Sequence, residues 1–108
     1  MNSVEGALQE LIGAIMNSAE YREFDRQRSL LRNYPGLKEQ IDRFRQENYA
    51  LQRFTEPDQL LDKMDEFSLK YEEFRKNPMV EAFLLAELEF CRMIQEINQK
   101  IVEAVNFE

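Results

Sequence analysis

Residues 79–108 contain neither glycine nor proline, and apolar residues recur there every three or four positions. That spacing places the apolar side chains on one side of an α-helix, so it predicts one long helix. Over 79–105 such a helix has about 27 residues and is about 40 Å long. A compact domain of this chain length is only about 33 Å across. We therefore expect the end of the helix to project beyond a compact monomer, with an apolar side that needs a cover.

The rest of the chain has few breaks, because only three glycines and three prolines occur in 108 residues. Because proline disfavours helix before it and is tolerated in a first helical turn, a proline-containing break can end one helix and begin the next. Between the breaks, apolar residues again recur at helical spacing. We expect helices over 4–16, 19–33, 36–54, 58–76 and 79–105.

These features predict an all-α fold, an elongated helical bundle in a single domain of residues 1–108. The shortage of turn residues argues against a β-sandwich or barrel. A second copy of the chain is the simplest cover for the projecting helix, which predicts a homodimer. We expect the dimer or packing seam to be formed by Phe83, Phe90, Ile94, Ile97 and Ile101.

The cysteine count and the net charge indicate where the chain is located and which partners it can have. One cysteine cannot form an internal disulfide, no signal peptide opens the chain and no apolar run is long enough to span a membrane, so we expect a cytoplasmic protein. The 14 Lys+Arg against 21 Asp+Glu give a net charge of −7, which disfavours a nucleic-acid partner. We expect a homodimer with a further, unidentified protein partner.

The positive charge is concentrated in the first half, where eight basic residues balance eight acidic ones; residues 55–108 hold six basic and thirteen acidic residues. Four arginines of one expected helix could form a face for a partner, although ordinary solvated surface is the stronger interpretation. The same arginines leave a directly RNA-associated regulator as an alternative. They are Arg22, Arg26, Arg28 and Arg32.

Catalytic chemistry has little support in this sequence. Histidine is absent, which removes the commonest general base and metal ligand. No glycine-rich phosphate loop or nucleophile elbow occurs. We therefore expect no enzymatic activity and no cofactor. A metal-binding or iron–sulfur-associated bundle is an alternative, with candidate ligands Glu20, Glu23, Asp62, Asp65 and Cys91.

The stronger interpretation of those candidates is structural. Surface carboxylates on helices are usually just hydrated, and Cys91 lies on the apolar side of its expected helix with Phe90 and Ile94, which favours a buried thiol. An iron–sulfur cluster usually needs four thiolates, and one cysteine per chain supplies at most two in a dimer.

Three stretches carry a family resemblance. They are Tyr21-Arg22-Glu23-Phe24, then Ile41-Asp42-Arg43-Phe44-Arg45-Gln46, and a closing stretch with Asn77, Pro78, Val80, Phe83, Ala86, Glu87, Phe90, Ile94, Ile97, Asn98 and Ile101. With these stretches the chain resembles the YlbF/YmcA family, including its YheA-like branch, over nearly its whole length. The motifs concern helix packing, so no functional residue is transferred from them.

The resemblance implies an all-α fold with a long α-hairpin and a homo-oligomer, usually a dimer. It also implies a cytoplasmic regulator of the kind tied to competence, sporulation and biofilm formation in Gram-positive bacteria. Two family members join a third protein in a complex that modulates an mRNA-processing ribonuclease and can carry iron–sulfur clusters. Those members bring extra cysteines that are not found here, so we expect no cluster in this chain.

Overall fold

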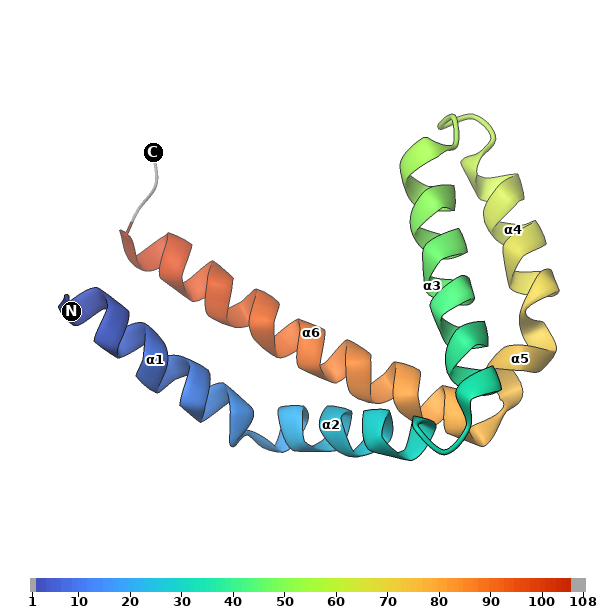
Figure 1. Cartoon of the computed structure of the whole chain (residues 1–108). Helices are drawn as coiled ribbons and strands as arrows, with labels where there is room; N and C mark the ends of the chain where they lie inside the picture. Colours follow the sequence, from blue (N-terminus) through green and yellow to red (C-terminus); the bar gives the residue numbers. More distant parts are fainter. Residues whose placement is uncertain (1, 106–108) are drawn as a thin grey trace. The chain divides into compact units, whose positions relative to one another are not determined.

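The computed structural model describes residues 2–105, which form α-helices joined by short turns, with no strand among them (Figure 1). The all-α prediction is confirmed. Four of the five expected helices end within two residues of their predicted limits. The helices are α1 (Ser3–Met16), α2 (Ala19–Leu31), α3 (Pro35–Phe54), α4 (Leu60–Lys70), α5 (Glu72–Lys76) and α6 (Pro78–Val105).

The expected helix over 58–76 is the exception, because it begins later and is divided into α4 and α5. At Tyr71 the backbone leaves the helical region, with φ −105° and ψ 13°, while its N–H still bonds to the carbonyl oxygens of Leu69 and Phe67. Nearer the start, the Gln59 N–H bonds to the Glu56 carbonyl and closes a turn. Both departures are local turns that the apolar spacing does not reveal.

The chain divides into two compact units. Unit 1 is Met1–Ser29 with Phe83–Glu108, and unit 2 is Leu30–Ala82. Unit 1 therefore contains α1 and most of α2 and α6, and unit 2 contains α3, α4 and α5. The assignment of 1–108 to a single domain stays a prediction.

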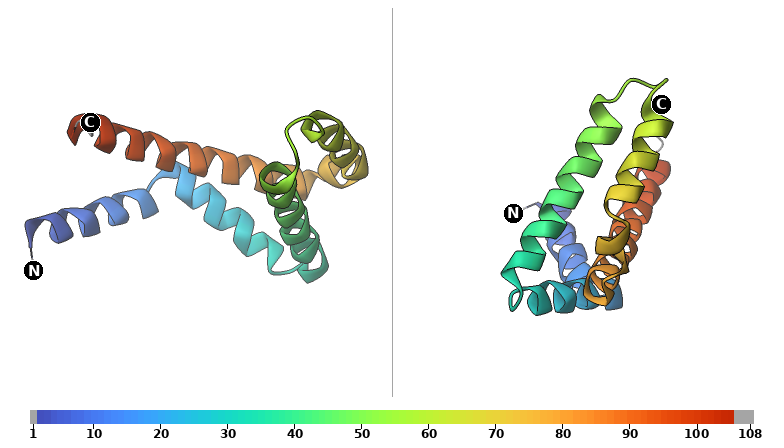
Figure 2. Two further views of the ribbon diagram at one scale, coloured as in Figure 1. Left: turned by 90° about the horizontal axis from the view of Figure 1, so that it is seen from above. Right: turned by 90° about the vertical axis from the view of Figure 1, so that its right-hand side faces the viewer.

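The core of unit 1 is a cluster of aromatic rings between α2 and α6, which run side by side in opposite directions (Figures 1 and 2). The Phe24 ring stacks on Phe90 with centroids 5.4 Å apart and lies 5.8 Å from the Phe83 ring. Tyr21 meets Phe90 edge to face at 5.4 Å. Such ring pairs add to the hydrophobic gain of burial, so they hold this part of α6 against α2.

The core of unit 2 is the hairpin of α3 and α4, whose helices lie side by side in both views (Figures 1 and 2). Phe44 is buried at its centre, with ring centroids 5.2 Å from Phe67, 5.1 Å from Tyr71 and 5.6 Å from Phe74. Ile41, one turn before Phe44 on α3, is also fully buried. This aromatic cluster fixes which sides of α3 and α4 face each other.

The described helices do not include a membrane span. None of them has both the length and the apolar character required to cross a bilayer.

Candidate protein-interaction surfaces

The residues expected to form the seam lie along α6 and differ strongly in exposure. Phe83 is 4% exposed and Phe90 is half-buried, and both contact Phe24 of the same chain. Ile94 and Ile97 are half-buried, and Ile101 is 48% exposed. The apolar side of α6 is therefore covered by α2 at its start and becomes accessible toward its end.

Helix α1 carries a second exposed apolar stripe in unit 1. None of its residues is buried, and Val4 at its start is 77% exposed. We use the name unit 1 apolar surface for the exposed large apolar residues of α1 together with those in the last turns of α6. They are Val4, Leu8, Ile12 and Met16 on α1, and Ile101, Val102 and Val105 on α6.

The four arginines do not form one face of α2. Arg32 lies in the turn that follows Leu31, where α2 ends, and not on the helix. At about 100° per residue, Arg28 lies roughly 140° around α2 from the pair Arg22 and Arg26. The Arg28 guanidinium borders the aromatic core, with its carbon 4.7 Å from the Phe24 ring centroid. The structure thus places Arg28 on a different side of α2 from Arg22 and Arg26, and leaves Arg32 outside the helix.

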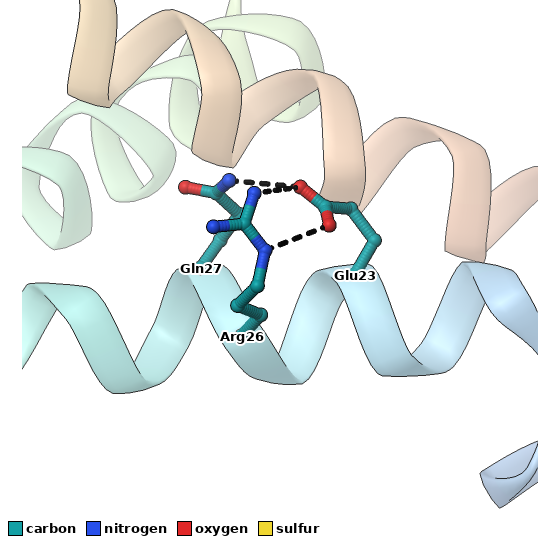
Figure 3. A network of polar contacts seen from close by, with 3 residues as sticks. All are labelled: Glu23, Arg26 and Gln27. Atoms are coloured by element: carbon teal, nitrogen blue, oxygen red, sulfur yellow. Dashed lines mark hydrogen bonds and ion pairs between the residues drawn. The ribbon is translucent and has the colours of Figure 1, made fainter.

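Arg26 is held by its neighbours on α2 (Figure 3). Its Nη2 and Nε donate to the two carboxylate oxygens of Glu23 at 2.8 and 3.0 Å, and the buried Gln27 amide donates to Glu23 Oε1 at 2.9 Å. The hydrogen bonds from Arg26 and Gln27 lower the pKa of Glu23 to about 2. The same pairing raises the pKa of Arg26. Part of the expected partner face is therefore engaged within the chain.

The candidate metal ligands are divided between the two units. Glu20 and Glu23 lie on α2 in unit 1, whereas Asp62 and Asp65 lie on α4 in unit 2. Residues 2–105 contain no group of three or more His, Cys, Asp or Glu placed to hold a metal ion.

The expectation of a buried thiol at Cys91 is wrong, because this side chain is exposed. The preceding residue, Phe90, faces the rings of α2. One residue further along a helix the side chain is turned by about 100°, which carries Cys91 off the packed side.

A polar cluster in unit 2 has no counterpart among the residues selected from the sequence. The Tyr71 hydroxyl donates a hydrogen bond of 2.5 Å to Glu47 Oε2, and Lys70 Nζ lies 3.0 Å from the same oxygen. The bonds from Tyr71 and Lys70 lower the pKa of Glu47. Burial, followed by the bond to the Glu47 carboxylate, raises the pKa of Tyr71 to about 12.

This cluster lies in a groove between α3 and α4. One hollow of about 340 Å³ contains Glu47 and Lys70, and a second of about 420 Å³ contains the same two residues, so the hollows are adjacent stretches of one groove. We call it the α3–α4 groove. Its lining is Gln40, Arg43, Glu47, Ala50, Leu51, Lys63, Glu66, Phe67, Lys70, Tyr71 and Phe74.

Fold and surfaces together define a small all-helical protein with exposed apolar and charged helix faces. The chain belongs to the family described as "Control of competence regulator ComK, YlbF/YmcA", which matches residues 4–106. The family resemblance read from the sequence is confirmed.

Two relatives are both named "UPF0342 protein", from Caldicellulosiruptor bescii and Caldicellulosiruptor saccharolyticus. Each is 24% identical over 110 residues, which cover 100% of this chain and 92% of the relative. Neither name states an enzymatic activity. No solved structure matches the chain.

Proposed function

We propose that this chain is a non-enzymatic cytoplasmic regulator that acts as a homodimeric scaffold for a protein partner. The family description, which concerns control of a competence regulator, supports a regulatory role. By the same resemblance, the processes regulated are competence, sporulation, biofilm formation or RNA processing.

The single observation that carries the proposal is the exposed state of α1. This helix has 14 residues, none of them buried. Isolated helices shorter than about 12–15 residues are marginal in water. Gly6 and Gly13 each cost α1 about 1 kcal/mol relative to alanine. A helix with no buried residue and with this composition should therefore fray, unless another surface covers its apolar stripe.

A second copy of the chain is the occupant that we propose for this surface. Two-fold pairing brings the same patch from both chains together, so one self-complementary surface is covered twice. The last turns of α6 add exposed apolar residues to the patch, among them Ile101. In this arrangement Phe83 and Phe90 hold α6 on α2, and Ile94, Ile97 and Ile101 contribute to the seam between copies.

The oligomeric state of the full chain tests the proposal. Sedimentation equilibrium should show a dimer for the wild type, and Ile97→Glu or Ile101→Glu should weaken dimerisation by roughly tenfold or more, which corresponds to about 1.4 kcal/mol. The matched control is Leu69→Glu, which places the same charge on a residue of unit 2 that is 72% exposed.

Circular dichroism shows whether each variant keeps its helices. Since Ile101 is already half-exposed, its replacement should leave the monomer folded. A wild-type chain that sediments as a monomer at micromolar concentration would contradict the homodimer. Equal dissociation of the dimer by Leu69→Glu and Ile101→Glu would contradict the proposed seam.

A further inference from the structure

The α3–α4 groove has an apolar floor and a charged rim. Leu51, Phe67 and Phe74 are half-buried and line it, and the rings of Phe67 and Phe74 pack on Phe44 beneath. The exposed cations Arg43, from α3, and Lys70, from α4, also line it. A rigid apolar floor between charged rims is the usual form of a surface that receives an amphipathic segment.

The charge of the groove is opposite to that of the chain. Its lining contains three cations, Arg43, Lys63 and Lys70, and two carboxylates, Glu47 and Glu66, whereas the whole chain carries −7. Glu47 is already satisfied, because it accepts hydrogen bonds from Tyr71 and Lys70. The lining of the groove thus carries a net charge of +1 on an acidic chain, which favours an acidic ligand over a basic one.

Arg43 is the cation best placed to receive that ligand. Its side chain is exposed and, within residues 2–105, forms no hydrogen bond or ion pair; its charge acts at a distance to lower the pKa of Glu47. A guanidinium can bind an incoming carboxylate through two parallel hydrogen bonds. Lys63, on the opposite rim, forms a 3.5 Å ion pair with the exposed Glu66.

The length of the rim fits a helix. Gln40, Arg43, Glu47, Ala50 and Phe54 follow one another on α3 at spacings of three and four, so they share one side of the helix over about 20 Å. Phe54, at the far end, is 74% exposed and offers an apolar contact beyond the hollows. No strand occurs among residues 2–105, so the described chain has no sheet edge to which an extended peptide could add.

We propose that the α3–α4 groove binds an acidic amphipathic helix of the partner protein, with apolar residues on the floor and a carboxylate at Arg43. This inference rests on the proposed function, since it names the surface that a scaffold would use and the chemistry of the segment bound there. Its residues belong to unit 2, whereas those of the proposed seam belong to unit 1.

A pair of designed peptides tests the groove on the full chain. The probes are fluorescein-labelled helical peptides of about 18 residues with leucine on one side and either glutamate or lysine among glutamines on the other. Fluorescence anisotropy should show that the glutamate peptide binds roughly tenfold or more tightly than the lysine peptide, and that added salt weakens it. Equal affinity for the two peptides, or no binding of either, would overturn the proposal.

Substitutions on the two rims locate the binding. Arg43→Glu and Lys63→Glu should each lower the affinity for the glutamate peptide by roughly three- to tenfold. The double variant should bind the lysine peptide more tightly than the wild type does, a gain that unfolding cannot produce. The matched control is Arg53→Glu, on α3 but outside the groove, where it stacks on Tyr49. If Arg53→Glu weakens binding of the glutamate peptide as much as Arg43→Glu does, the assignment of the binding site to the α3–α4 groove is wrong.

The dimer variants separate this inference from the proposed function. Ile101→Glu should bind the glutamate peptide as the wild type does, because the groove lies within unit 2 of one chain. If the chain sediments as a monomer and binds the glutamate peptide, the homodimer proposal is wrong and the groove proposal stands. If the chain is a stable dimer and binds neither peptide, the groove proposal is wrong and the homodimer proposal stands.

Discussion

The Tyr71 hydroxyl and the Glu47 carboxylate form a hydrogen bond of 2.5 Å across the α3–α4 hairpin, 24 residues apart in the sequence. The bond connects the residue that follows the end of α4 with the middle of α3. Tyr71 is also packed against the rings of Phe44 and Phe67. One side chain therefore contributes both apolar packing and a charge-assisted hydrogen bond to the hairpin.

This relationship predicts an alkaline limit to stability. Burial and the Glu47 carboxylate raise the pKa of Tyr71 from 10.0 to about 12, so the folded state holds this proton more tightly than the unfolded chain does. The resulting stabilisation is fully present below about pH 10 and is lost as the pH rises toward 12. Ultraviolet titration of phenolate should show a late step that Tyr71→Phe removes. Tyr49→Phe, at an exposed tyrosine, should leave that step in place.

The hydrogen bonds to Glu23 on α2 predict an acidic limit to stability. Hydrogen bonds from Arg26 and Gln27 lower the pKa of Glu23 from 4.5 to about 2. The stabilisation from this group is therefore present above about pH 4.5 and is lost as the pH falls toward 2. Carboxyl NMR titration of Arg26→Ala should find the pKa of Glu23 higher than in the wild type. Arg22→Ala removes a neighbouring guanidinium that makes no bond to Glu23, so a similar rise there would contradict the assignment.

Helix boundaries were accessible from the sequence where backbone chemistry marks them. Pro35 and Pro78 each begin a helix, as expected from a ring that fits the first turn. The division at Tyr71 was not accessible, because Phe67, Tyr71 and Phe74 continue the helical apolar spacing without interruption. A change of backbone angle at one residue leaves that spacing intact.

The candidate surfaces were accessible only in part. The spacing along α6 identified its apolar side, but not that α2 covers Phe83 and Phe90 while Ile101 is left accessible. The Tyr71–Glu47 bond joins two helices, and a pairing of that kind has no local sequence signal. Knowledge of which helices pair is needed to find such groups.

The aromatic core of unit 2 predicts a large difference between two phenylalanines of α3. Phe44 is buried and contacts three rings, so Phe44→Ala should lower the free energy of unfolding by about 3–5 kcal/mol. Phe54 is exposed, and Phe54→Ala should change the same quantity by no more than about 0.5 kcal/mol. Urea denaturation followed by circular dichroism measures both. Equal losses would mean that Phe44 is not the centre of this core.

The exposure of Cys91 predicts a reactive thiol in the folded chain. Thiol reagents reach an exposed cysteine without unfolding, whereas a buried thiol reacts only when the protein opens. The rate of reaction with a chromogenic disulfide should therefore be within about tenfold of the rate in denaturant. Cys91→Ser, which removes the single thiol, gives the background rate of the reagent. A reaction slowed by several orders of magnitude would show that Cys91 is covered in solution. If the dimer provides that cover, Ile101→Glu, which weakens the dimer, should restore the fast reaction.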